Sequence, residues 1–174
     1  GFPASFTIYD TEDTTSVLRA IIKEMHLSPE VYNAAPIRSR ISLAKSNMYS
    51  PASYRQNLQW MEEDRAAKRP YTVDIYEKYM ARCRRSGAMD FDDLLLQLHH
   101  LFEQNPENVL EKYRKKFKYI HVDEFQDTNY LQYAILRQLT RYPGSGENLF
   151  AVGDDAQSIY AFRGATIDNI LNFE

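Results

Sequence analysis

The chain has 174 residues, of which 44% are hydrophobic and 26% charged, a balance typical of a globular chain and not of a disordered one. It contains no apolar run near the roughly 18 residues that cross a bilayer, and its start lacks a signal-peptide pattern, so neither a membrane protein nor a secreted one is expected. The single cysteine, Cys83, excludes an internal disulfide framework and a cysteine-rich zinc site. It favours a reducing, cytoplasmic location.

The formal net charge of −3 hides an uneven distribution of charged residues along the chain. Residues 38–85 carry 11 basic and 5 acidic residues, whereas residues 86–174 carry 8 basic and 14 acidic ones. A basic surface attracts phosphate backbones. Solvated helix faces would explain the same charges without any partner, so charge alone leaves both interpretations open.

The first two-thirds of the chain has the apolar spacing of helices. Asp13 can cap a helix with an i, i+4, i+8 apolar stripe, and Ser28-Pro29 is a second start signal. Gly87 fits the end of a helix on whose apolar face Cys83 lies, so Cys83 is expected in the core. Further helices are expected over residues 37–48, 71–85, 90–105 and 107–116, with a weaker pattern over 51–67.

The pattern changes at residue 118. Residues 118–122 and 148–152 have the composition of strands, and residues 130–141 between them have helical spacing. This order predicts a parallel βαβ unit, followed by helices over residues 157–162 and 166–173. Because parallel sheets are normally larger than two strands, we expect the rest of an α/β sheet outside these 174 residues.

Two acidic residues, Asp123 and Glu124, directly follow the first predicted strand. The carboxyl ends of parallel strands are where open α/β sheets bind ligands. An aspartate there can hold Mg²⁺, and an adjacent glutamate can deprotonate an attacking water in phosphoryl transfer. The same carboxylates could instead complement the dipole of the following helix.

A second polar segment, GDDAQSIYAFRGA at residues 153–165, follows the second predicted strand. Gln157 could sense a terminal phosphate by hydrogen bonding. Tyr160, Phe162 and Arg163 supply two aromatic faces and a cation, which suit the stacking of single-stranded bases. The two aromatic residues could equally belong to the core of a short helix.

Together with DFDDLL at residues 90–95, the segments DEFQDT at 123–128 and GDDAQSIYAFRGA resemble motifs of superfamily 1 DNA helicases of the UvrD/PcrA/Rep type. The resemblance covers the whole chain. It implies a mostly helical α/β fold in which residues 1–88 form the inserted helical subdomain 1B. Residues 89–174 would then form part of the RecA-like motor subdomain 1A, a truncated P-loop NTPase domain.

The resemblance also implies roles for individual residues. Asp123 corresponds to the Mg²⁺ ligand, Glu124 to the catalytic base and Gln157 to the contact with the γ-phosphate of ATP. The residues implied in binding single-stranded DNA are Tyr160, Phe162, Arg163 and Phe91. The parent protein would hydrolyse ATP, move 3′→5′ on single-stranded DNA and unwind duplexes at junctions between single and double strands.

The chain departs from the family pattern at two places. Many relatives have a basic residue where Ala161 stands and tryptophan where Phe162 stands, although Phe162 can still stack on a base. No G-x-x-x-x-G-K-[S/T] phosphate loop occurs in the 174 residues. We therefore expect a segment of a longer helicase, inactive without the remaining helicase domains.

Two other functions compete with this interpretation. A metal-dependent nuclease or phosphohydrolase needs no phosphate loop and could use an acidic cluster of Asp123, Glu124, Asp127, Asp154 and Asp155. A non-catalytic DNA-binding module would use the basic helical part alone. The adjacent His99 and His100 are not expected to bind a metal, because i, i+1 spacing does not bring two side chains to one helix face.

Overall fold

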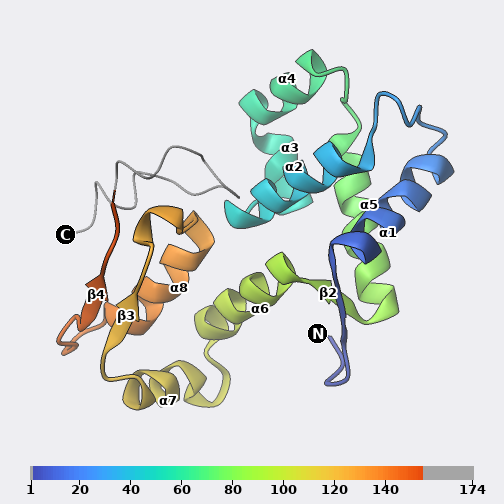
Figure 1. Cartoon of the computed structure of the whole chain (residues 1–174). Coiled ribbons are helices and arrows are strands. Elements are labelled where there is room, and N and C mark those ends of the chain that lie inside the picture. Colours follow the sequence, from blue (N-terminus) through green and yellow to red (C-terminus); the bar gives the residue numbers. More distant parts are fainter. Residues whose placement is uncertain (1, 155–174) are drawn as a thin grey trace. The chain divides into compact units, whose positions relative to one another are not determined.

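The computed structural model describes residues 2–154 and divides them into two compact units (Figure 1). The first unit contains residues 2–45 and 49–94, and the second contains residues 46–48 and 95–154. The expected subdomain boundary at residues 88 and 89 stays a prediction. The helices expected over 157–162 and 166–173 lie outside the described residues.

The first unit consists of helices and one pair of short strands. The strands β1 and β2 are parallel, with Thr7 opposite Ala88 and Tyr9 opposite Asp90. Helices α1 and α5 lie side by side (Figure 1). Its elements are β1 (Thr7–Tyr9), α1 (Thr11–Glu24), α2 (Ala34–Ser46, of which Ser46 belongs to the second unit), α3 (Pro51–Gln56), α4 (Leu58–Ala66), α5 (Thr72–Ser86) and β2 (Ala88–Asp90).

Local hydrogen bonds set the ends of these helices. The Asp10 carboxylate accepts hydrogen bonds from the backbone N–H groups of Glu12 and Asp13 at 2.7 and 2.8 Å. In turn, the Asp13 carboxylate accepts a hydrogen bond from the Asp10 N–H group. The expectation that Asp13 caps α1 is therefore wrong by three residues. Asp10 is the N-cap, and Asp13 is the third residue of the helix, whose side chain completes the capping box. The predicted stop of α5 at Gly87 is confirmed by its left-handed φ of 58°.

Two other expectations for the first unit need correction. No helix begins at Ser28-Pro29, and the next helix starts only at Ala34. The weakly patterned run over residues 51–67 forms two helices, α3 and α4, separated at Asn57. The Asn57 side chain accepts the backbone N–H of Trp60 at 3.1 Å, so this residue ends one helix and caps the next.

The core of the first unit is formed by the inward faces of its helices. Leu18 and Ile21 of α1, Ile41 of α2 and Tyr79 of α5 are among the side chains that are almost fully buried. Cys83 lies in the same cluster with 1% of its surface exposed, which confirms its expected core position.

A fully buried lysine, Lys45, lies among these helices. Its Nζ is 2.6 Å from Asp90 Oδ2 and 2.7 Å from Asp93 Oδ1. The Tyr79 hydroxyl donates to Asp90 Oδ2 at 2.8 Å. Burial opposes the charged ammonium group, but the carboxylates of Asp93 and Asp90 outweigh burial and raise the pKa of Lys45 above its ordinary value. Asp90 and Asp93 of the DFDDLL segment thus form a buried ion network with Lys45.

The second unit contains the parallel strands β3 and β4, joined through α8. Ile120 lies opposite Leu149 and Val122 opposite Ala151, which confirms the predicted parallel βαβ order and the mostly helical α/β class. Buried core side chains include Phe102, Leu131 and Ile135. Its elements are α6 (Phe91–Gln104, which starts in the first unit), η1 (Pro106–Asn108), α7 (Val109–Lys116), β3 (Ile120–Val122), η2 (Phe125–Asp127), α8 (Tyr130–Thr140) and β4 (Leu149–Ala151).

The helices within residues 2–154 are all too short or too polar to cross a membrane.

Candidate active site at the end of strand β3

The carboxyl ends of β3 and β4 meet at the same edge of the second unit. The Val152 N–H group donates to the Val122 carbonyl at 2.8 Å, and the Phe125 N–H group donates to the Val152 carbonyl at 2.9 Å. The two chain segments therefore stay paired beyond the strands. Asp123 and Glu124 leave β3 at this point with exposed side chains.

The backbone turns sharply at Glu124. This residue adopts a left-handed φ of 50°, which is uncommon for a residue other than glycine. The Asp123 carboxylate accepts the Glu124 N–H group at 3.0 Å and supports the turn. Because such a conformation requires support from its surroundings and is frequent at functional sites, it marks Glu124 as a functional candidate.

Gln126 joins the two strand ends through its side-chain amide. Its Nε2 donates to the Glu124 carboxylate, and its Oε1 accepts the Asp154 N–H group at 3.1 Å. Gln126 is 2% exposed, so the bridging side chain itself is buried, whereas Glu124 at one end of the bridge is exposed. A Cβ atom on Gly153 would lie 2.6 Å from Gln126 Oε1, which explains why a glycine stands beside the bridge.

A cavity of about 420 Å³ lies next to these acidic residues. Its polar side is formed by Asp123, Glu124 and Asp127, whose carboxylate oxygens are the donors that Mg²⁺ prefers. Asp123 would fit such an ion, with water and phosphate oxygens as the remaining ligands. The other lining residues are Thr128, Gln132, Leu95, Leu98, Val122, Ile135 and Leu136.

Among the residues that the structure describes, the acidic side chains at the end of β3 do not gather into a cluster that could hold two metal ions. Within residues 2–154, no group of three ligand atoms close together includes Asp123, Glu124, Asp127 or Asp154. Asp155 lies outside the described residues. The geometry therefore gives the nuclease hypothesis no support of its own.

The structure locates only part of the expected site. Phe91 belongs to the first unit and is 61% exposed, so its ring is accessible to a ligand. Gln157, Tyr160, Phe162 and Arg163 lie outside the described residues. Sequence reasoning did not find the bridging role of Gln126. The signal in the sequence is Gly153, the glycine shortly after β4. Its meaning becomes clear only in the fold, where it leaves room for the Gln126 side chain.

A family model described as the UvrD/REP helicase N-terminal domain matches residues 1–174. The chain belongs to this family. It is 40% identical over 174 residues to the ATP-dependent DNA helicase PcrA of Bacillus subtilis, and 38% identical to the proteins of that name from Leuconostoc citreum and Staphylococcus aureus strain Mu50. Each alignment covers 100% of this chain and 22% of the relative.

Membership of the UvrD/REP family confirms the resemblance that the three sequence segments carry. The chain spans about a fifth of the length of these helicases. The strand β3 with Asp123 and Glu124 therefore belongs to the N-terminal domain of an ATP-dependent DNA helicase family.

Proposed function

We propose that this chain is part of the motor of an ATP-dependent 3′→5′ DNA helicase, located in the cytoplasm. The motor would couple ATP hydrolysis to movement along single-stranded DNA and to unwinding at strand junctions. The observation that carries the proposal is the geometry at the end of β3. There, two exposed carboxylates border a cavity, and one of them is tied by Gln126 to the segment that follows β4.

The two carboxylates would have different roles. Asp123 would hold Mg²⁺, which when bound neutralises negative charge on the phosphates of ATP. Glu124 would accept a proton from the water that attacks the γ-phosphate. The Gln126 amide donates to the Glu124 carboxylate and keeps it oriented toward the cavity edge.

Gln126 also offers a physical route between nucleotide and DNA. Its Oε1 holds the Asp154 N–H group, three residues before Gln157, which would contact the γ-phosphate. Tyr160, Phe162 and Arg163 follow at once and would stack on bases and hold a phosphate, together with Phe91 of the first unit. A change in the contact between Gln157 and the γ-phosphate would thus shift the DNA-binding side chains, which lie only a few residues further along the chain.

These 174 residues do not contain the phosphate loop that cradles ATP in this class of protein. The remaining helicase domains of a longer protein would have to supply it. We therefore expect this chain alone to hydrolyse no ATP, with or without single-stranded DNA.

The decisive experiment measures Mg²⁺-dependent ATP hydrolysis, with and without single-stranded DNA, in the longer protein that carries this chain. Glu124→Gln should lower kcat by about 100-fold or more, the usual contribution of a general base, while DNA binding is retained. Glu107→Gln, at an exposed glutamate that does not line the cavity, should leave kcat unchanged. Full hydrolysis by Glu124→Gln would refute the assigned base.

Two further measurements, DNA cleavage without ATP and ATP hydrolysis by the 174-residue chain, separate the competing functions. Mg²⁺-dependent cleavage of DNA without ATP would favour the nuclease hypothesis. DNA-stimulated ATP hydrolysis by the 174-residue chain alone would show that the nucleotide site is complete within it, against our proposal.

A further inference from the structure

Two histidines and a glutamate, His99, His100 and Glu103, project from one side of α6. With about 100° between successive residues of a helix, Glu103 stands about 40° around the helix from His99 and about 60° from His100. It therefore lies between the two histidines. The argument from i, i+1 spacing considered the two histidines alone and left out the glutamate one turn further on.

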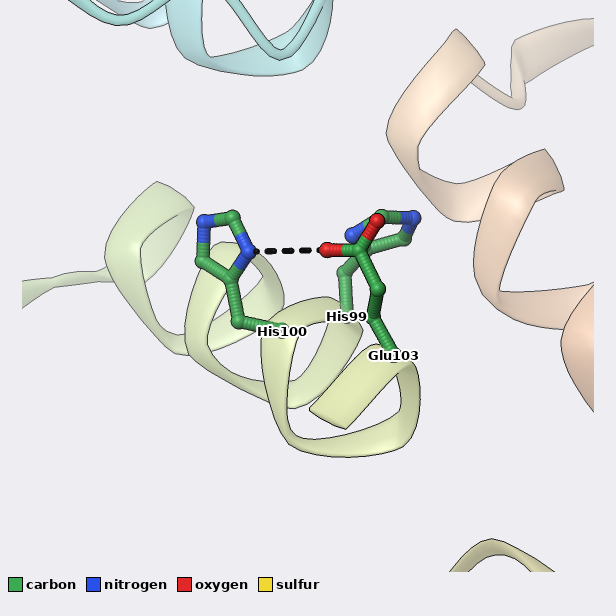
Figure 2. Close-up of side chains that lie close together, drawn as sticks. All are labelled: His99, His100 and Glu103. Atoms are coloured by element: carbon green, nitrogen blue, oxygen red, sulfur yellow. Dashed lines mark hydrogen bonds and ion pairs between the residues drawn. The ribbon is translucent and has the colours of Figure 1, made fainter. Parts of the chain in front are cut away.

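The three side chains are close enough to share one ion. Figure 2 shows the Glu103 carboxylate directed toward the His100 ring, with Nδ1 and Oε2 3.4 Å apart. One ligand atom from each of His99, His100 and Glu103 lies within 4.8 Å of the other two. Ligands held at about 2.0–2.2 Å from Zn²⁺ must lie somewhat closer together than this. His100 and Glu103 have 52% and 62% of their side-chain surface exposed, so small rotations can close the gap.

His99 supplies a second, independent observation. Its Nδ1 is buried and has no hydrogen-bond partner, and within residues 2–154 the only other such side-chain atom is Gln138 Oε1. Nearly all buried polar side-chain atoms in proteins have a partner, so an exception calls for one, such as an ion or a water molecule. The imidazole with this unpartnered nitrogen belongs to the same three-residue group.

We propose that His99, His100 and Glu103 form a binding site for a divalent transition-metal ion of the Zn²⁺ class. Two imidazole nitrogens and one carboxylate oxygen are ligands that suit Zn²⁺ and its neighbours, whereas Mg²⁺ and Ca²⁺ prefer oxygen ligands only. Three protein ligands leave a fourth position for water. The ion would fasten successive turns of α6 and would be separate from the Mg²⁺ ion that Asp123 is proposed to hold.

The test titrates Zn²⁺ into the 174-residue chain, with a chromophoric chelator as competitor. We expect one strong site, and we expect His100→Ala and Glu103→Gln each to weaken it by at least about tenfold. Loss of even an indirect partner of a metal ligand commonly weakens binding by about 10–100-fold. Both residues are exposed, so these variants should fold. Zn²⁺ should also raise the unfolding temperature of the unaltered chain but not that of His100→Ala.

Matched controls use an exposed histidine and an exposed glutamate elsewhere in the chain. His26→Ala and Glu30→Gln should bind Zn²⁺ as the unaltered chain does. Absence of Zn²⁺ binding would overturn the proposal, as would binding that survives both ligand variants. Binding that is lost in Asp123→Asn instead would place the ion at the end of β3 and would equally overturn it.

Discussion

Replacement of the buried Lys45 by methionine should destabilise the first unit strongly. Methionine matches the length of the lysine stem but removes the ammonium group. The Asp90 and Asp93 carboxylates, now 2.6 and 2.7 Å from Nζ, would remain buried without their counter-charge. Breaking a buried ion pair by removing one partner typically destabilises a protein by about 3–5 kcal/mol, because an uncompensated charge stays in a medium of low polarity.

The surroundings of Lys45 place this variant at the upper part of that range. Lys45 is 0% exposed, and the Asp90 and Asp93 side chains are 11% and 8% exposed, so water cannot replace the ammonium group without opening the core. Arg55 is a matched comparison, because it also pairs with two carboxylates, those of Asp74 and Glu77, but with side chains 40%, 36% and 62% exposed. Arg55→Met should destabilise by about 0–1 kcal/mol.

Urea unfolding followed by circular dichroism measures both effects. With a slope of about 2 kcal/mol per molar urea, Lys45→Met should lower the midpoint by about 2 M, and Arg55→Met by less than about 0.5 M. Adding Asp90→Asn and Asp93→Asn to Lys45→Met should recover part of the loss. Asparagine can still accept the Asp93 N–H bond that now ends on Asp90. Equal urea midpoints for Lys45→Met and Arg55→Met would refute the argument that the buried carboxylates need the Lys45 ammonium group. If the added asparagines restore no stability, the destabilisation by Lys45→Met comes from altered packing and not from the unpaired charges.

Three further outcomes are expected. Burial raises the pKa of the Tyr76 and Tyr79 hydroxyls above the ordinary 10.0, so on raising the pH the unfolded chain loses these hydroxyl protons before the folded chain does. The two tyrosines therefore contribute their full stability below about pH 10, and urea midpoints measured at several pH values should fall above it. Gly153→Ala places a Cβ atom 2.6 Å from Gln126 Oε1 and should speed amide hydrogen exchange at Asp154; unchanged exchange would mean that the bridge tolerates the methyl group. Burial raises the pKa of the Cys83 thiol to about 11, so a disulfide reagent should modify it only as the chain unfolds, and rapid labelling of the native chain would contradict its core position.

The sequence predicted the elements with strong local signals and missed those that depend on distant partners. The end of α5 at Gly87 and the order of β3, α8 and β4 follow from local patterns, and the structure confirms them. The strands β1 and β2 were not predicted, because each has only three residues and is defined by its pairing across 80 residues of chain. Pro29 suggested a helix start, but no helical stripe follows it before Ala34.

The candidate site was predictable in its residues but not in its connections. The acidic pair at the end of β3 follows from the strand pattern and from the family motif. The bridge through Gln126 depends on how closely β4 approaches η2, and neither local propensity nor residue spacing encodes that distance. The histidine–glutamate group on α6 could have been found from the sequence. Helical geometry alone brings His99, His100 and Glu103 to one side of the helix, but this requires all three positions to be considered together.

The charge pattern of residues 38–85 is also changed by the fold. Of the eleven basic residues there, Lys45 is buried, and Arg40, Arg55 and Arg82 form ion pairs. Those charges are already neutralised and contribute little to a long-range potential. The basic residues of this stretch with exposed side chains and no ion pair in the described part of the chain are Arg65, Lys68, Lys78, Arg84 and Arg85.

Any attraction of DNA by this stretch must rest mainly on those five side chains. Each phosphate contact with single-stranded DNA contributes about 0.7 to the slope of log affinity against log salt concentration, so these five side chains can account for a slope of about 3.5. Eleven contacts, the number that the sequence alone would suggest, would give about twice that value. A measured slope well above 3.5 for the 174-residue chain would require further contacts, either from the partly exposed Arg38 and Arg69 or from basic residues outside residues 38–85. Outside that stretch, Arg163 would be the first residue to examine, because only a cationic side chain adds to this slope.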